Sequence, residues 1–152
     1  MKKLFVFIFI FITTLLVSCS NIEYSRNVTK PVENYYTKSI KSLKSEEIKE
    51  IKLIENKFYK EVILDKTSSN LILEMINSLD ESKTVEALND YIECLFKLHI
   101  ESNSNKYVID VYGNDIISIY PWDGIYEKDF LDISSLPLSL KAESICNFLL
   151  KN

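Results

Sequence analysis

A segment near the middle of the chain alternates apolar and polar residues, and this pattern constrains the fold more than any other. Between Tyr91 and Ile100 every second residue is apolar, namely Ile92, Cys94, Phe96, Leu98 and Ile100. Successive side chains of a strand point to opposite faces of its sheet. The segment is therefore predicted to be a β-strand with one buried face.

Two further strands are predicted directly after it. Ser102 to Asn105 has the composition of a turn, and Lys106 to Tyr112 is rich in strand-forming residues. Gly113-Asn114 marks the next turn, and Asp115 to Tyr120 the third strand. Short connections of this kind join antiparallel neighbours, so we expect a meander.

The apolar face of this sheet needs a cover, and two helices are predicted to supply it. Ser68 to Leu79 carries an apolar stripe at the helical period, made of Leu71, Ile72, Met75, Ile76 and Leu79. Thr67, Ser68 or Ser69 is expected to cap this helix.

A second stripe follows Pro137, a residue tolerated at a helix start, and consists of Leu138, Ala142, Ile145 and Leu149. The expected fold is α+β: an antiparallel meander sheet of three to five strands, with the mid-chain and C-terminal helices on one face.

Residues 46–60 allow two interpretations. Phe58 to Leu64 is strand-like, which favours two strands that meet near Glu55-Asn56-Lys57. The alternative is one helix from Ser42 to Lys60, because Ser45-Glu46-Glu47-Ile48 has the character of a helix start.

The first residues indicate export. Lys2-Lys3 precede a mainly apolar run of fourteen residues from Leu4 to Val17, whereas a membrane-spanning helix needs about 20. Leu16-Val17-Ser18-Cys19 resembles the lipobox of bacterial lipoproteins. That resemblance implies a diacylglyceryl group on the Cys19 thiol, cleavage before Cys19, and acylation of the new amino terminus, for example with palmitate.

These features predict three parts: a lipoprotein signal peptide at 1–18, the lipidated Cys19 with a flexible tether at 19–38, and one small α+β domain at 39–152. The domain would lie on the extracytoplasmic face of the cell membrane, or of the outer membrane in a cell with two. Loss of Lys2 and Lys3 changes the formal net charge from −4 to −6. An acidic chain is a poor candidate for binding nucleic acid.

Residues that perform chemistry are scarce. His99 is the only histidine and is expected at the surface or rim, without a partner at metal-ligand spacing. Asp123, Asp129 and Asp132 match no calcium loop and are interpreted as solvated loop acids. Gly124-Ile125-Tyr126 lacks the companion motifs of the nuclease family named for that tripeptide. We expect no cofactor, no metal and no enzymatic activity.

The segment from Tyr120 to Tyr126 holds the only tryptophan, Trp122, between two tyrosines. Aromatic rings on a turn can form a ledge for sugars or peptides, or a lid over the core. The flanking apolar residues Ile117 and Ile119 favour the lid. As a ledge, Tyr120, Trp122 and Tyr126 would form a partner-binding turn.

Two cysteines remain besides Cys19. Outside the membrane Cys94 and Cys146 could form a disulfide, or they could be two buried thiols. We favour free thiols, because a domain of this size can bury a core without such a bond.

Residues 46–127 resemble a small uncharacterised domain family in secreted and membrane-attached proteins of low-GC bacteria. The resemblance rests on Lys83-Thr84, on Asn89-Asp90 before a strand, and on the final strand that leads into Pro121-Trp122-Asp123-Gly124-Ile125-Tyr126. It implies a compact sensor-like or accessory domain.

The predicted function is that of a lipid-anchored binding or accessory protein of the bacterial cell envelope. The membrane would be contacted through the N-terminal lipid, and the partner would be another envelope protein or a wall polymer. The alternative is an envelope hydrolase with an unrecognised carboxylate site.

Overall fold

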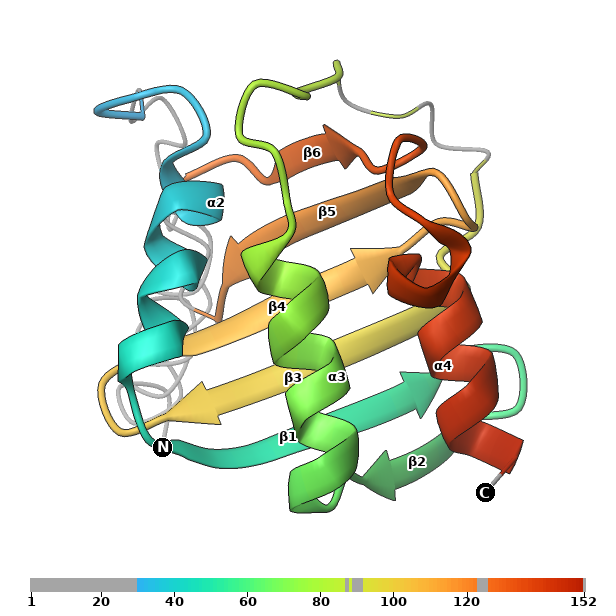
Figure 1. The fold of residues 1–152 in the computed structure, drawn as a ribbon. Helices are drawn as coiled ribbons and strands as arrows, with labels where there is room; N and C mark the ends of the chain where they lie inside the picture. Colours follow the sequence, from blue (N-terminus) through green and yellow to red (C-terminus); the bar gives the residue numbers. More distant parts are fainter. Residues whose placement is uncertain (1–29, 87, 89–91, 123–125, 152) are drawn as a thin grey trace, which may run out of the picture.

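A six-stranded antiparallel sheet forms the centre of the fold (Figure 1). The computed structural model describes residues 30–86, 88, 92–122 and 126–151. The strands follow the order β2-β1-β3-β4-β5-β6 across the sheet. Their bounds are β1 Ile48–Glu55, β2 Lys60–Ile63, β3 Phe96–Ser102, β4 Lys106–Val111, β5 Ile116–Pro121 and β6 Asp129–Asp132.

The helices of the described residues cover the same face of this sheet, as Figure 1 shows. They are α2 (Tyr35–Ile40), α3 (Lys66–Asn77) and α4 (Ala142–Lys151), with short 3-10 segments η1 (Lys41–Ser45) and η2 (Leu138–Leu140). The core lies between the two layers. Among the described residues, no helix is both long and apolar enough to span a membrane.

The strand register explains why one face is apolar and the other polar. Leu98 of β3 pairs with Ile109 of β4, which pairs with Ile119 of β5, and all three side chains are fully buried under the helices. One residue along, Lys97 pairs with Asp110, and Asp110 pairs with Ser118. Because side chains alternate, this polar row lies on the opposite face, which we call the open face.

The predicted fold class is confirmed, with one strand more than the expected range. The additional strand is β6. The sequence pattern does not reveal it, because two of its four residues are the acids at its ends, Asp129 and Asp132, and only two apolar residues lie between them. The two-strand interpretation of residues 46–60 is confirmed, and the single-helix alternative is wrong. Gly113 takes a φ of 101° in the β4–β5 turn, a conformation that glycine adopts without steric cost.

Several predicted details differ from the structure. Asp65, not Thr67, Ser68 or Ser69, caps α3: its side chain accepts a hydrogen bond from the Ser68 N–H at 2.8 Å. Leu138 belongs to η2 and is 68% exposed, so the C-terminal stripe begins only at Ala142.

The first predicted strand starts later than its sequence pattern. β3 begins at Phe96, and Ile92 is 45% exposed. Cys94 is half-buried, and its thiol donates to the Phe96 carbonyl. The apolar alternation before Phe96 therefore continues beyond the buried sheet.

The domain begins earlier than expected. Residues 35–38, assigned to the tether, form part of α2, and Tyr36 and Thr37 are buried in the core. The Asp129 carboxylate accepts from both the backbone N–H and the hydroxyl of Thr37, at 2.8 and 3.0 Å. Lys30 forms an ion pair with the same carboxylate at 2.6 Å. This buried acid corrects the prediction that Asp129 is a solvated loop residue.

The two cysteines of the domain are free thiols, as favoured from the sequence. Cys146 is fully buried in α4, whereas Cys94 is only half-buried. Burial raises the pKa of Cys146 to about 12, so this thiol stays protonated at neutral pH.

Candidate functional site

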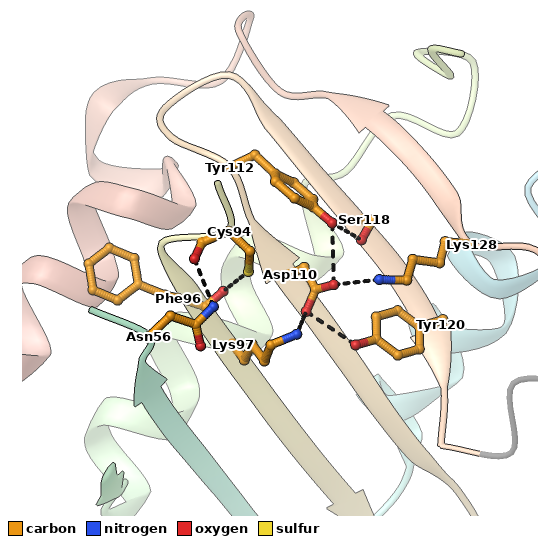
Figure 2. A network of polar contacts seen from close by, with 9 residues as sticks. All are labelled: Asn56, Cys94, Phe96, Lys97, Asp110, Tyr112, Ser118, Tyr120 and Lys128. Atoms are coloured by element: carbon orange, nitrogen blue, oxygen red, sulfur yellow. Dashed lines mark hydrogen bonds and ion pairs between the residues drawn. The ribbon is translucent and has the colours of Figure 1, made fainter. Parts of the chain in front are cut away.

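A buried carboxylate organises the centre of the open face. The side chain of Asp110 in β4 is 1% exposed. Lys97 Nζ lies 2.9 Å from Asp110 Oδ1, and Lys128 Nζ lies 2.7 Å from Asp110 Oδ2 (Figure 2). Each carboxylate oxygen therefore has its own ammonium partner.

Two tyrosines complete this cluster. Tyr120 donates its hydroxyl hydrogen to Asp110 Oδ1 at 3.2 Å, and Tyr112 donates to Oδ2 at 3.3 Å. Lys128 Nζ also lies 4.2 Å from the centre of the Tyr120 ring. We call these five residues, Lys97, Asp110, Tyr112, Tyr120 and Lys128, the Asp110 network.

The charges of this network perturb its pKa values. Burial raises the pKa of the Asp110 carboxyl, but hydrogen bonds and ion pairs from Lys128 and Lys97 outweigh burial and hold it below its ordinary value. Burial, together with the Asp110 charge, raises the pKa of Tyr120 to about 12. At neutral pH Asp110 is thus ionised and Tyr120 protonated, the states in which they bond to each other.

The Asp110 network is closed. Among the described residues, no buried side-chain nitrogen or oxygen lacks a hydrogen-bond partner. A carboxylate that is saturated by two ammonium groups and two hydroxyl groups is a poor general base, because its lone pairs are occupied. The arrangement stabilises the sheet rather than presenting a reactive group.

A hollow of about 610 Å³ opens at one end of the sheet, where α2 meets the β3–β4 turn and the end of β5. Half of its lining residues are aromatic: Tyr35, Tyr36, Tyr107, Trp122 and Tyr126. The remaining lining residues are Ser39, Ser104, Asn105, Lys106 and Pro121. We call this feature the aromatic hollow.

Trp122 lies at the rim of the aromatic hollow and is 65% exposed. The prediction that it is a buried lid is therefore wrong. Its backbone N–H donates to the Lys106 carbonyl at 3.1 Å, which fixes the main chain beyond β5. The His99 ring contacts the indole edge-to-face at 5.7 Å, and Lys106 Nζ lies 5.6 Å from the indole centre. Trp122 is thus held in place while it faces solvent.

Three tyrosines form another wall. The Tyr35 ring lies 5.4 Å from the Tyr36 ring and 5.3 Å from the Tyr126 ring, both in edge-to-face geometry. The Tyr36 hydroxyl accepts a hydrogen bond from the Tyr126 N–H at 2.7 Å. Tyr36 is buried, whereas Tyr35 is 36% exposed. The wall therefore has a buried base and an accessible outer ring.

The residues of the predicted partner-binding turn separate into two regions. Trp122 and Tyr126 line the aromatic hollow, whereas Tyr120 belongs to the Asp110 network. Asp123 lies outside the described residues. His99 lies at the rim beside Trp122, as expected, and burial together with Lys97 and Lys52 lowers its pKa.

Sequence reasoning missed several residues of both regions. Tyr35 and Tyr36 were assigned to the tether, although an aromatic pair in a polar segment is a signal for packing. Asp110 was also missed. An acid within a mainly apolar strand such as Lys106–Val111 is unusual, and a buried carboxylate needs an oppositely charged or hydrogen-bonding partner.

Metal-binding groups do not cluster in the described part of the chain, where no three His, Cys, Asp or Glu residues could hold an ion together. Among the described residues that line the aromatic hollow, none is acidic. The described lining offers ring faces, hydroxyl groups, one amide and the ammonium group of Lys106, a set that suits binding.

Comparison with known proteins identifies the family to which this chain belongs. Residues 30–146 match the family described as domain of unknown function DUF4883. A crystal structure of a candidate lipoprotein from Clostridium perfringens is similar, with 39% sequence identity and a TM-score of 0.70, over 82% of this chain and 100% of that one. No curated protein matches the chain. The family match and the identity over most of both chains show that this chain belongs to the DUF4883 family.

Proposed function

We propose that this protein is a lipid-anchored, extracytoplasmic binding or accessory protein of the bacterial envelope, and that the aromatic hollow is its binding site. Two observations support the anchor: the lipobox-like Leu16–Cys19, and the similarity to the candidate lipoprotein. The exposed Trp122 at the rim of the hollow is the observation that carries the binding function.

An exposed tryptophan held by its neighbours is typical of a binding site. Large aromatic side chains contribute disproportionately to recognition because they bury much area and lose little conformational entropy. Trp122 already contacts His99 and Lys106, so its position is largely set before a partner arrives. Such preorganisation lowers the entropic cost of binding.

The composition of the hollow supports binding over hydrolysis. A carboxylate hydrolase needs acids that converge on a cavity. The buried acids Asp110 and Asp129 each form ion pairs, with Lys97 and Lys128 or with Lys30, and neither lines the hollow. We therefore propose that the protein acts by contact, with another envelope protein or a wall polymer as its partner.

Anchoring is tested by metabolic labelling with a radioactive fatty acid. The wild-type protein should be labelled, and Cys19→Ala should carry no label. Label retained by the variant would contradict lipidation at Cys19.

Binding is tested by sedimentation of the purified full-length protein with envelope fragments of the source cell that have been freed of lipid. Trp122→Ala should be retained at least about tenfold less than wild type. Phe58→Ala removes another exposed aromatic ring, 70% exposed on the β1–β2 turn, and should be retained like wild type. Equal retention of the two variants would contradict the assignment of the hollow.

A further inference from the structure

The ligand class of the aromatic hollow can be argued from its lining. We infer that the hollow takes a neutral glycan, with one sugar ring stacked on Trp122 and sugar hydroxyls bonded to the polar groups around it. This inference rests on the proposed binding function and adds the chemistry of the ligand.

The charge of the hollow favours a neutral ligand. Lys106 is the one charged residue among the described lining residues, and its Nζ pairs with Glu101 at 2.8 Å. An anionic polymer would need free cations, and the whole chain carries a formal charge of −4. A cationic ligand would need a carboxylate, and the described lining contains none.

The ring faces suit a sugar. The face of an aromatic ring carries negative charge density, and the C–H bonds on one side of a pyranose present a weakly positive, apolar surface to it. Trp122 is the most exposed ring of the lining, and Tyr35 is the next. These two rings would contact successive parts of an oligosaccharide.

The polar groups of the rim suit hydroxyls. Ser104 is exposed, and a serine hydroxyl both donates and accepts a hydrogen bond. The Tyr35 hydroxyl and the Trp122 indole N–H add one donor each on exposed side chains. A sugar carries many such groups close together, so several can be matched at once.

A peptide fits the same site less well. Extended peptides are recognised largely through main-chain hydrogen bonds. The backbone N–H of Trp122 is taken by the Lys106 carbonyl at 3.1 Å, and that of Tyr126 by the Tyr36 hydroxyl at 2.7 Å. On the β3–β4 turn, the backbone N–H groups of Ser104 and Asn105 lie 3.3 and 3.0 Å from the Ser102 hydroxyl. Side chains therefore remain as the main means of recognition.

The experiment uses the fluorescence of Trp122, which is the only tryptophan of the full chain and therefore reports this site alone. Full-length protein, in a detergent without a sugar headgroup, is titrated with soluble tetramers of glucose and of N-acetylglucosamine. Polygalacturonate serves as the anionic probe and tetra-alanine as the peptide probe. A saturable change with a neutral sugar tetramer, and none with the other two, is expected.

Two variants that keep Trp122 locate the response. Tyr35→Ala and Ser104→Ala should each weaken the sugar response at least about fivefold, whereas Phe58→Ala should leave it unchanged. Circular dichroism of each variant confirms that it is folded. A sugar response unaffected by both Tyr35→Ala and Ser104→Ala would overturn the inference, as would a response to the anionic or peptide probe alone.

The two proposals fail differently. If neither sugar changes the fluorescence while retention on envelope fragments still depends on Trp122, the glycan assignment is wrong and the binding site stands. If retention is also independent of Trp122, both proposals are wrong.

Discussion

In the Asp110 network, lysine and tyrosine side chains turn toward one buried carboxylate, whereas in the aromatic hollow the side chains of Trp122, Tyr35 and Ser104 are exposed to solvent. Asp110 is 1% exposed and has four partners, and Trp122 is 65% exposed. The difference separates polar groups that stabilise the fold from those that remain available to a ligand. The polar cluster most prominent in the structure is therefore not the proposed site.

The largest expected effect is at the base of the hollow. Tyr36→Ala removes a ring that is 2% exposed and packed into the core, and should cost about 3–5 kcal/mol of unfolding free energy, as large aromatic truncations do. Tyr35→Ala, at the neighbouring but 36% exposed position, should cost less than about 1 kcal/mol. Urea unfolding followed by circular dichroism measures both. Equal losses of unfolding free energy in the two variants would contradict the assignment of Tyr36 to the buried base and of Tyr35 to the exposed rim of the hollow.

The next effect concerns Asp110. Asp110→Asn removes the charge that holds Lys97 and Lys128 and should destabilise the protein by about 2–3 kcal/mol, below the range for fully buried pairs because both lysines are about one-third exposed. Glu127→Gln, at an exposed position, is the control and should change the stability little. Trp122 fluorescence should respond to ligand in Asp110→Asn as in wild type. A lost response would mean that the two regions are coupled.

The pH dependence follows from the lowered pKa of Asp110. An aspartate in the unfolded chain has a pKa of about 3.9. In the folded protein the pKa of Asp110 is lower than that. Below pH 4 the unfolded chain binds more protons, so the stability that Asp110 supplies is present above that pH and is lost as the pH falls through the folded pKa. Wild type should therefore lose stability more steeply than Asp110→Asn in this range. If the unfolding free energies of wild type and Asp110→Asn fall in parallel as the pH is lowered, the Asp110 carboxylate does not contribute to the pH dependence of stability.

The smallest expected change in stability is at Trp122. Trp122→Ala removes an exposed ring and should shift the unfolding free energy by no more than about 0.5 kcal/mol, while retention on envelope fragments falls. A loss of several kcal/mol would restore the lid interpretation. Denaturant melts of both proteins, read by circular dichroism because the variant lacks the fluorophore, measure the difference.

The fold was largely predictable because its strands alternate and its helices carry apolar stripes. The meander β3–β4–β5 and the helix α3 follow from periods that a single sequence displays. β6 was not predictable, because Asp129 at its start is bonded to Thr37 and Lys30, which lie 92 and 99 residues away in the sequence. Such long-range polar contacts leave no local period.

The candidate site was predictable in part. The aromatic residues around Trp122 indicated a turn that acts either as a lid on the core or as a binding ledge. Whether Trp122 faces the core or the solvent depends on how the chain leaves β5 at Pro121. The residues opposite it, such as Tyr35 and Ser104, belong to distant segments. Their convergence is a property of the tertiary structure and could not be read from spacing.

Acrylamide quenching of Trp122 in the full-length protein, alone and with delipidated envelope fragments, shows whether the aromatic hollow is covered when the protein binds. Alone, Trp122 should be quenched nearly as strongly as in urea, because it is 65% exposed. When the protein is bound to the fragments, quenching should fall markedly, because the ligand covers the indole. If Trp122 of the bound protein is quenched as strongly as before, the aromatic hollow is not the binding site, since binding would then occur elsewhere.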